Sequence, residues 1–566
     1  MCHTIAVTEP SDHTGEHLDH LVRRSWTPAG GQDAILPPHA ARWLASKTGL
    51  TPRSTPAAPD SALAVAESAL PDVARKALEN VVGSGHVLRG RDDRLGRTGG
   101  LSYVDLLRHR GTGELTVPDA VVLPADPDEV QRVVEVCAEH GVGVVPFGGG
   151  TSVVGGVQSL RGDKESVVVL DLCRLDKLVS VDPVSRLAVL QAGVVAPEAE
   201  RLLAAHGFTL GHVPQSFERA TIGGFAATRS SGQASSGYGR FEDMVEGVRM
   251  ATPRGEWRLG VAPASAAGPD LRQLVVGSEG ALGVLTEVTV RVRPLPTVRR
   301  YEGFVFDGWT GGAAVVRELA QHRVLADVTR LSDPQETEMA FALSGGWKTA
   351  VVQRYLRLRG MVNPCLLVLG WEGASKAEVA GRRKATLRVL RGLKPVSLGT
   401  PVGEKWRHGR FGGPRQRDAL MDLGVCVETL ETATYWSTVD TLRSVVRAAL
   451  QESLAEQGVV PLVACHVSHA YETGASLYFT TIVPRDLDDP IGQWQRAKAA
   501  ACTAISSHGP LGTISHHHAV GVDHAPYLPA EIGTLGVDVL AAVKRELDPE
   551  GVLNPGKLVG EPRQTG

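Results

Sequence analysis

The sequence lacks paired cysteines. Its seven cysteines stand singly along the chain, and no Cys-x-x-Cys pair occurs. Neither a zinc knuckle nor a disulfide framework is therefore expected, and this usage favours a reducing compartment.

Long apolar runs and a basic excess are also missing. No stretch reaches about 18 consecutive apolar residues, so no membrane-spanning helix is expected. The first 25 residues carry acids and histidines where a signal peptide needs an apolar core. The formal net charge is −3, which gives no electrostatic footprint for nucleic acid. We expect a cytoplasmic protein that binds no nucleic acid.

At 566 residues the chain is too long for one hydrophobic core. Its pattern of predicted strands and helices divides it into four segments. Residues 1–115 predict a helical or irregular N-terminal arm. Strands and helices alternate over 116–297, where "ADPDEVQRVVEVCAEHG" predicts a helix with Asp126 as its N-cap. Residues 298–500 predict a separate α+β domain. The last segment, 501–566, holds a helix that ends at Asp548 and then a turn rich in Gly, Pro and Asn.

The segment "PFGGGTSVVGGV", 146–157, concentrates five glycines. Glycine permits positive φ and close backbone approach, so successive N–H groups can face a phosphate. A flexible surface loop is the competing interpretation. The spacing fits neither the dinucleotide-binding fingerprint nor a Walker loop.

Two further segments are poor in large apolar residues. "QSFERATIGGFAATRSSGQASSGYGRFEDMVEGVRMATPRG", 215–255, suits a long loop around a polar ligand, and a disordered connector is the alternative. "GSEGALGVLTEV", 277–288, is a glycine-rich turn that leads into a buried strand, which alone is a weak signal.

Three histidines stand side by side in "TISHHHAVG", at 516–518. Adjacent side chains on an extended strand point to opposite faces, so at most two can share one target. From the residues alone, a metal site, a proton-handling site and ordinary loop histidines all stay open.

Taken together, "PFGGGTSVVGG", "TIGGFAATRSSG", "YGRFEDMVEGVRMATPRGE" and "GSEGALGVLTEVTVRVRP" resemble the FAD-binding domain of the vanillyl-alcohol oxidase superfamily. Within it, "TRLSD", "RDALMDLG", "LETATYW", "HAYETGASLYFTTI" and "TISHHHAVG" resemble the alkyldihydroxyacetonephosphate synthase (alkylglycerone-phosphate synthase) family. The resemblance runs from about residue 84 to 558. It implies an α+β fold: a two-lobed FAD-binding domain, an α+β cap over the substrate site, and a C-terminal segment that returns to the FAD domain.

The resemblance also implies an FAD site. The loop 146–157 lacks the His or Cys that tethers flavin in many relatives, so we expect non-covalent FAD, with His212 as the nearest exception. Gln215 stands where we expect an acid in family members. The expected cofactor-binding residues are Pro146, Phe147, Gly148, Gly149, Gly150, Thr151, Ser152, Gln215, Ser216, Thr221, Gly224, Thr228, Ser230, Ser231, Glu279, Gly280, Gly283 and Leu285.

For catalysis, the resemblance implies Tyr478 as the acid/base and Arg330 as an active-site arginine. A guanidinium binds phosphate bidentately, which suits the implied role of Arg417 toward the substrate phosphate. His516, His517 and His518 would lie beside the flavin and Tyr478 and handle protons. No metal is expected, because no further Cys or acid ligand at suitable spacing is evident.

The implied reaction exchanges the acyl chain of acyl-dihydroxyacetone phosphate for a fatty alcohol through a flavin N5 adduct, as in ether-lipid synthesis. The implied partners are these small lipids, with peripheral contact at the inner membrane face and a homodimer as further expectations. The alternative is an FAD-linked 2-hydroxy-acid dehydrogenase or oxidase, in which Arg417 or Arg330 binds a carboxylate. A flavin-binding protein without catalysis is disfavoured by the presence of Tyr478, Arg417 and the three histidines.

Overall fold

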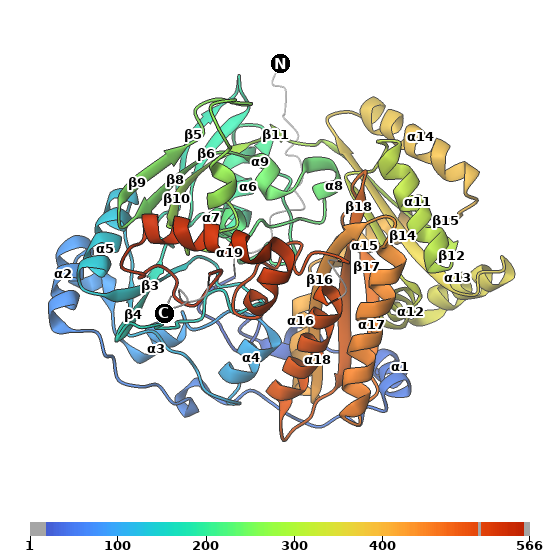
Figure 1. Cartoon of the computed structure of the whole chain (residues 1–566). Helices are drawn as coiled ribbons and strands as arrows, with labels where there is room; N and C mark the ends of the chain where they lie inside the picture. Colours follow the sequence, from blue (N-terminus) through green and yellow to red (C-terminus); the bar gives the residue numbers. More distant parts are fainter. Residues whose placement is uncertain (1–17, 508–510, 560–566) are drawn as a thin grey trace, which may run out of the picture.

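The computed structural model describes residues 18–507 and 511–559, and its strands form three large sheets and one short ribbon (Figure 1). The first sheet has the order β1-β2-β4-β3. Its strands are β1 (Val87–Leu88), β2 (Ala120–Val122), β3 (Val142–Phe147) and β4 (Ser166–Asp171). β2, β4 and β3 run parallel. Parallel strands need crossover helices, and α5 (Pro127–Glu139) is one of them.

Helix α5 forms as the sequence predicts. The Asp126 side chain accepts a hydrogen bond from the Glu129 backbone N–H at 2.9 Å and thereby caps the helix. The predicted apolar stripe of α5 is buried against the sheet: Val130, Val133, Val134 and Cys137.

The second lobe is an antiparallel sheet of order β5-β6-β10-β8-β9. Its strands are β5 (Leu178–Asp182), β6 (Leu187–Gln191), β8 (Val245–Thr252), β9 (Gly255–Leu259) and β10 (Val284–Arg291), while β7 (Phe208–Thr209) pairs with β11 (Arg293–Pro294). The accompanying helices are α6 (Ala196–Ala204), α7 (Ile222–Ala227), α8 (Ser235–Tyr238), α9 (Phe241–Met244) and α10 (Arg272–Val275). The long polar segment 215–255 is not one loop, because it contains the helices α7, α8 and α9 and the strand β8.

A seven-stranded antiparallel sheet of order β15-β12-β14-β13-β17-β18-β16 forms the cap. Its strands are β12 (Val298–Asp307), β13 (Val328–Ser332), β14 (Pro364–Gly373), β15 (Val396–Gly399), β16 (Val425–Tyr435), β17 (Leu462–Val467) and β18 (Gly474–Pro484). One face packs on α11 (Trp309–Gln321), α14 (Lys376–Gly392), α17 (Val439–Glu456) and α18 (Pro490–Ser506). The remaining cap helices are α12 (Pro334–Ser344), α13 (Gly346–Leu358), α15 (Thr400–Gly409) and α16 (Gly413–Asp422).

Strand β18 shows how the cap sheet acquires two different faces. Successive side chains of a strand point to opposite faces. Leu477 and Phe479 are buried in the core with the helices. Tyr478, Thr480 and Ile482 alternate with them and line a cavity on the other face.

The two ends of the described chain join these parts. α2 (Asp72–Val82) belongs to the core of the first lobe, whereas α1 (Pro38–Thr48) contacts α12 of the cap. The short helices α3 (Arg91–Leu95) and α4 (Tyr103–His109) follow. After α19 (Leu528–Leu547) the chain returns to β3, where the Val144 N–H donates to the Val552 carbonyl at 2.7 Å.

These contacts bear on the segment boundaries expected from the sequence. We propose that the first lobe begins near residue 70, because α2 and β1 share its core. The boundary expected at residue 500 falls inside the continuous helix α18, and we propose moving it beyond Ser506. Within the described residues, no helix combines the length and apolarity needed to cross a membrane.

Candidate active site

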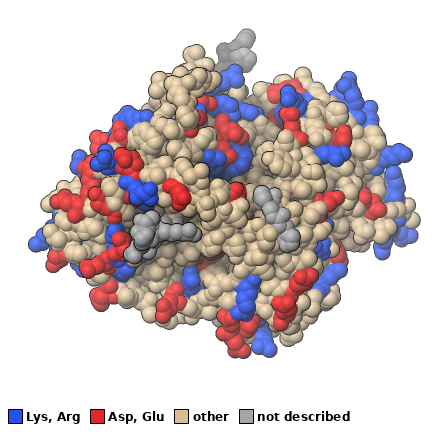
Figure 2. All heavy atoms as spheres, viewed as in Figure 1, with Lys and Arg blue, Asp and Glu red and all other residues tan. Residues whose placement is uncertain are grey.

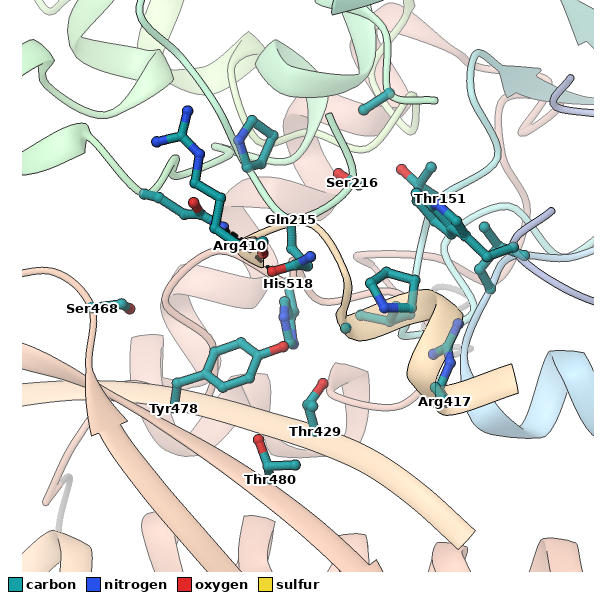
Figure 3. Close-up of a pocket in the computed structure, with 18 of the residues that line it drawn as sticks. Thr151, Gln215, Ser216, Arg410, Arg417, Thr429, Ser468, Tyr478, Thr480 and His518 are labelled. Carbon is teal, nitrogen blue, oxygen red and sulfur yellow. Dashed lines mark hydrogen bonds between the residues drawn. The ribbon is translucent and has the colours of Figure 1, made fainter. Parts of the chain in front are cut away.

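A cavity of about 1080 Å³ lies between the first two lobes and the inner face of the cap sheet. The glycine loop after β3 lines one side, and strands β16, β17 and β18 with the histidine run line the other. Figure 3 shows Thr151 and Arg417 on one side of this space and Tyr478, Thr429 and Thr480 on the other.

The glycine loop fits a pyrophosphate. The backbone N–H groups of residues 148–152 donate no hydrogen bond to any described residue, although Gly148 to Ser152 all line the cavity. A Cβ at Gly149 would collide with the Arg219 carbonyl, and one at Gly148 with the Thr221 side chain. Successive free N–H groups in a glycine-rich turn form an anion-binding concavity, so the loop could hold the FAD pyrophosphate through its backbone.

All residues expected from the sequence to bind the cofactor line this cavity, Gln215 included. They come from three separated segments, 146–152, 215–231 and 279–285, that the two lobes bring together. His212 is not among the lining residues. Its Nε2 lies 3.0 Å from the Ser230 hydroxyl, and its ring packs against Phe225 and Phe241. The roles of the lining residues in FAD binding stay predictions, as does the non-covalent attachment of FAD.

Tyr478 is the middle member of a row of three side chains on neighbouring strands, Glu431, Tyr478 and His466, which we call the Tyr478 row. In the sheet register it pairs with Glu431 of β16 on one side and with His466 of β17 on the other. Its ring stacks on His466 at a centroid distance of 4.8 Å, and His518 meets it edge-on at 5.6 Å. Burial raises the pKa of Tyr478 to about 12, so the phenol is neutral at physiological pH.

Arg330 contacts His466, and His466 in turn stacks on Tyr478. Glu336 accepts from Arg330 at 2.6 Å and lies 3.0 Å from His466 Nδ1. Burial opposes the charge of Glu336, but Arg330 and His466 hold its pKa at about 2. Burial and Arg330 lower the pKa of His466, which is therefore a neutral imidazole. The sequence reasoning missed His466 and Glu336, and the alternation of "ACHVSHA" is the only signal for His466.

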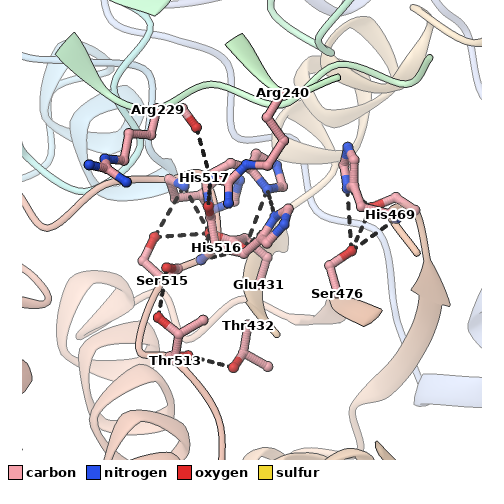
Figure 4. Close-up of polar contacts among 12 residues, drawn as sticks. Arg229, Arg240, Glu431, Thr432, His469, Ser476, Thr513, Ser515, His516 and His517 are labelled. Atoms are coloured by element: carbon pink, nitrogen blue, oxygen red, sulfur yellow. Dashed lines mark hydrogen bonds and ion pairs between the residues drawn. The ribbon is translucent and has the colours of Figure 1, made fainter. Parts of the chain in front are cut away.

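The histidine run is held by one buried carboxylate, Glu431 (Figure 4). The backbone N–H groups of His516, His517 and His518 all donate to it at 2.8–2.9 Å, as does the Ser515 hydroxyl at 2.9 Å. Burial would raise the pKa of Glu431, but the surrounding imidazoles, His517 first, hold it well below its usual range. Glu431 is a positioning residue. It stands in "LETATYW", one of the motifs that carry the family resemblance, but the sequence alone assigned it no role.

Only two of the three histidines line the cavity, but they are neighbours in sequence, because residues 516–518 form bends and not the extended strand that the alternation argument assumed. His517 and His518 line the cavity, whereas His516 lies behind them. His516 Nε2 is 2.6 Å from the Tyr471 hydroxyl, and its Nδ1 is 2.9 Å from His517 Nδ1. His516 thus contacts the cavity only through His517, and the proton-handling role of the three histidines stays a prediction. Burial lowers the pKa of His518 to about 3.

His469, His516 and His517 bring their ring nitrogens within 4.8 Å of one another, a spacing that could hold a metal ion. Both nitrogens of His469 already have partners: the Gly232 carbonyl at 2.9 Å and the Ser468 hydroxyl at 2.8 Å. His516 is likewise bonded at both nitrogens. The geometry is that of a hydrogen-bonded network, which suits proton handling.

Replacing Glu431 with glutamine should displace the histidine run, because an amide nitrogen would meet N–H donors that now share a carboxylate. We expect kcat to fall about tenfold or more, since donors left unsatisfied in a buried site cost about 1–3 kcal/mol each. Amide hydrogen exchange over residues 513–521 should accelerate. The exposed Glu456→Gln serves as the control. Wild-type activity and exchange in Glu431→Gln would contradict the positioning role.

Arg417 of α16 lines the cavity near the glycine loop (Figure 3). Its nearest carboxylate oxygen, of Glu428, is 4.0 Å away, and its buried Nε has no hydrogen-bond partner among the described residues. Neighbouring Arg415 pairs with Glu218 at 2.8 Å instead. Arg417 is thus a cavity guanidinium with donor capacity left for an anion.

One end of the cavity is apolar. It lies between α1, α12, α16 and the inner face of the cap sheet. Its lining residues are Ala40, Trp43, Leu44, Met339, Leu343, Leu420, Val427 and Ile482. This apolar arm has the character of a site for an aliphatic chain.

Comparison with known proteins agrees with this geometry. Residues 118–259 match the family model of an FAD binding domain, and residues 295–558 match that of the FAD linked oxidases, C-terminal domain. Alkyldihydroxyacetonephosphate synthase from Dictyostelium discoideum is 32% identical over 485 residues, which is 83% of this chain and 78% of the relative. The synthase from Trypanosoma brucei brucei is 32% identical over 475 residues, 82% of this chain and 76% of the relative.

Comparison of the fold with solved structures identifies the same synthases. A solved structure of alkyldihydroxyacetonephosphate synthase superposes with a TM-score of 0.79 at 29% identity and covers 92% of both chains. The expected fold, FAD as cofactor and enzymatic character are thereby confirmed. The chain belongs to the alkyldihydroxyacetonephosphate synthase family of FAD-dependent enzymes.

Proposed function

We propose that the protein exchanges the acyl chain of acyl-dihydroxyacetone phosphate for a fatty alcohol and so forms an alkyl ether. One observation carries this proposal: a single cavity joins the FAD loop, the Arg417 guanidinium, the Tyr478 row and the apolar arm. The family relatives bear the name of this synthase. The exchange breaks the C–O bond to the fatty acid and makes one to the alcohol, with no net transfer of electrons.

Arg417 would bind the substrate phosphate. A guanidinium forms paired, charge-assisted hydrogen bonds with phosphate oxygens, and this one reaches the cavity from the first half of α16. The apolar arm would take the acyl or alkyl chain on the other side of the reacting carbon. A substrate with a charged head and a long tail thus matches both ends of the cavity.

The residues around Tyr478 would move protons. When bound, FAD supplies an electrophilic ring system. Tyr478 is neutral because its pKa is about 12, so it can donate a proton. It can act as a base only after its hydroxyl proton has passed to a neighbouring group. Burial lowers the pKa values of the neighbouring His466 and His518 imidazoles, so both are neutral and weak bases. The Tyr478 oxygen would therefore take the proton from the substrate carbon and deprotonate the alcohol, with the histidine run assisting it.

The alternative, an FAD-linked 2-hydroxy-acid dehydrogenase or oxidase, uses the same cofactor lobes. Two observations favour the exchange reaction over it. Arg330 is already paired with Glu336, which leaves it little capacity for a substrate carboxylate. A small hydroxy acid would also leave the apolar arm without a role.

Replacing Arg417 with alanine should raise KM for acyl-dihydroxyacetone phosphate about tenfold or more, because hydrogen bonds to charged groups contribute about 1.5–3 kcal/mol. KM for the fatty alcohol should change little, since that substrate carries no phosphate. Arg496→Ala, at a half-exposed site on α18, is the control. Equal KM values for the phosphate substrate in Arg417→Ala and wild type would remove Arg417 from the phosphate site.

We also propose a peripheral membrane contact through α13. Trp347, Val351 and Leu358 are 73%, 57% and 78% exposed and share one face of the helix at spacings of four and seven. Arg354 and Arg357 of the same helix are exposed, and Figure 2 shows basic side chains along the edge where α13 and α14 lie. Lys348 and Val352, on the adjoining side of the helix, line the cavity, so lipid substrates could enter beside this helix.

Replacing Trp347 and Leu358 together with serine should lower binding to vesicles that contain anionic lipid. Each removes exposed apolar area worth about 25 cal/mol per Å² on insertion, so we expect about tenfold weaker binding in a sedimentation assay. Val184→Ser, at a 93% exposed site on the β5–β6 turn, is the control. Unchanged vesicle binding would exclude α13 as the contact.

We propose in addition that the protein forms a homodimer through the part of α19 that follows its kink at Gly533. Leu535 and Val539 are 74% and 51% exposed there and stand four residues apart, on one face of the helix. Analytical ultracentrifugation of wild type and Leu535→Glu tests this proposal, and a monomeric wild type would refute it.

A further inference from the structure

We propose that Arg23, in the segment before α1, is a positioning residue of the FAD pyrophosphate loop, and that residues 18–30 thereby form part of the cofactor site. This assigns a role to the N-terminal arm. It depends on FAD binding and not on which reaction follows.

Arg23 is buried, with 3% of its surface exposed. Its Nη2 donates to the carbonyl oxygens of Gly99, Gly100 and Gly150 at 2.6, 2.7 and 2.7 Å. Gly150 belongs to the glycine loop, and the other two lie in the turn before α4. One guanidinium therefore joins the arm, that turn and the loop.

A second buried arginine fixes the segment that carries Arg23. Arg219 donates to the Val22 carbonyl at 2.7 Å, to the Ser25 carbonyl at 3.3 Å and to the Trp26 carbonyl. Its own backbone carbonyl lies where a Cβ of Gly149 would be. The arm is thus attached to the loop from two sides.

The bond to Gly150 determines where the next N–H points. In a planar trans peptide, the C=O of one residue and the N–H of the next point in opposite directions, and the described residues contain no cis bond. Because Arg23 holds the Gly150 carbonyl, the Thr151 N–H is directed away from Arg23. Thr151 lines the cavity, and its N–H donates to no described acceptor. The cation at the carbonyl end also polarises this peptide toward an anion.

The loop needs such an anchor. Glycine loses more conformational freedom on ordering than other residues, and Gly150 adopts a left-handed φ of +61°. No described carboxylate lies within ion-pair distance of Arg23. Burial lowers its pKa to about 9, so it stays charged at neutral pH. An isolated buried charge is costly, and a pyrophosphate on the far side of the loop would supply the compensating charge.

The test compares full-length Arg23→Gln with Arg24→Gln, the neighbouring arginine whose side chain is 40% exposed. Dissociation constants of flavin-free protein are measured for FAD and for riboflavin, which lacks the pyrophosphate. We expect Arg23→Gln to weaken FAD binding about tenfold or more, as for hydrogen bonds to charged groups, and to leave riboflavin binding unchanged. Arg24→Gln should match wild type for both ligands.

Arg23→Lys provides a second variant should the glutamine variant fail to fold. It keeps the charge, but an ammonium lacks the planar fork that holds separate carbonyls, so we expect about threefold weaker FAD binding. Wild-type FAD affinity in Arg23→Lys and Arg23→Gln would overturn the proposal. An equal loss for FAD and riboflavin would also overturn it, because it would indicate a general disturbance of the site.

Discussion

Replacing Tyr478 with phenylalanine is expected to lower kcat by about 10²–10⁴-fold, the usual contribution of a general acid or base. The change removes only the hydroxyl, and the ring can keep its stacking on His466. FAD content and the unfolding temperature should therefore stay near those of wild type. The loss should appear in kcat, because the hydroxyl acts on the reacting atoms and not on the phosphate or the chain.

The control for Tyr478→Phe is Tyr435→Phe, at a 70% exposed tyrosine of β16. It removes the same group from a tyrosine of the same sheet that does not line the cavity. If Tyr478→Phe turned over like this control, the proton-handling role would have to pass to the imidazoles of His517 and His518.

Replacing Gly149 with aspartate is expected to abolish FAD binding. Its Cβ would collide with the Arg219 carbonyl, so the loop must move, and a carboxylate would then face the pyrophosphate at close range. The purified variant should be colourless, without the flavin absorbance bands of wild type. Gly381→Asp is the matched control, because a Cβ there has nothing within 4 Å.

A Gly149→Asp protein with the full flavin content would show that the pyrophosphate binds elsewhere. The assignment of loop 146–157 as the pyrophosphate site and the proposed role of Arg23 would then both be refuted. Loss of flavin in Gly149→Asp with wild-type affinity in the Arg23 variants would contradict only the latter.

Local patterns in the sequence were sufficient for much of the fold. The N-cap at Asp126 and the apolar stripe of α5 depend on neighbours three or four residues apart, which the sequence displays directly. The cofactor-lining residues were found because short glycine-rich motifs resemble those of a family. In both cases the information lies within about ten consecutive residues.

The supporting residues could not be predicted in the same way. Glu431 meets the histidine run only through the register of β16 with β18 and a bond across 85 positions of sequence. His466 reaches Tyr478 through the register of β17 with β18. Arg23 contacts Gly150 across 127 positions. Such contacts depend on how sheets and loops pack, and a single sequence does not display that packing.

The central claim is a redox-neutral exchange at this cavity, and anaerobic turnover tests it most directly. Under nitrogen, with acyl-dihydroxyacetone phosphate, hexadecanol and no electron acceptor, the enzyme should release fatty acid and form alkyl ether over many turnovers. Lactate or 2-hydroxyglutarate should leave the flavin absorbance unchanged. Rapid bleaching of the flavin by a hydroxy acid, with neither fatty acid nor ether formed from the lipid substrates, would contradict the account and establish the oxidoreductase alternative.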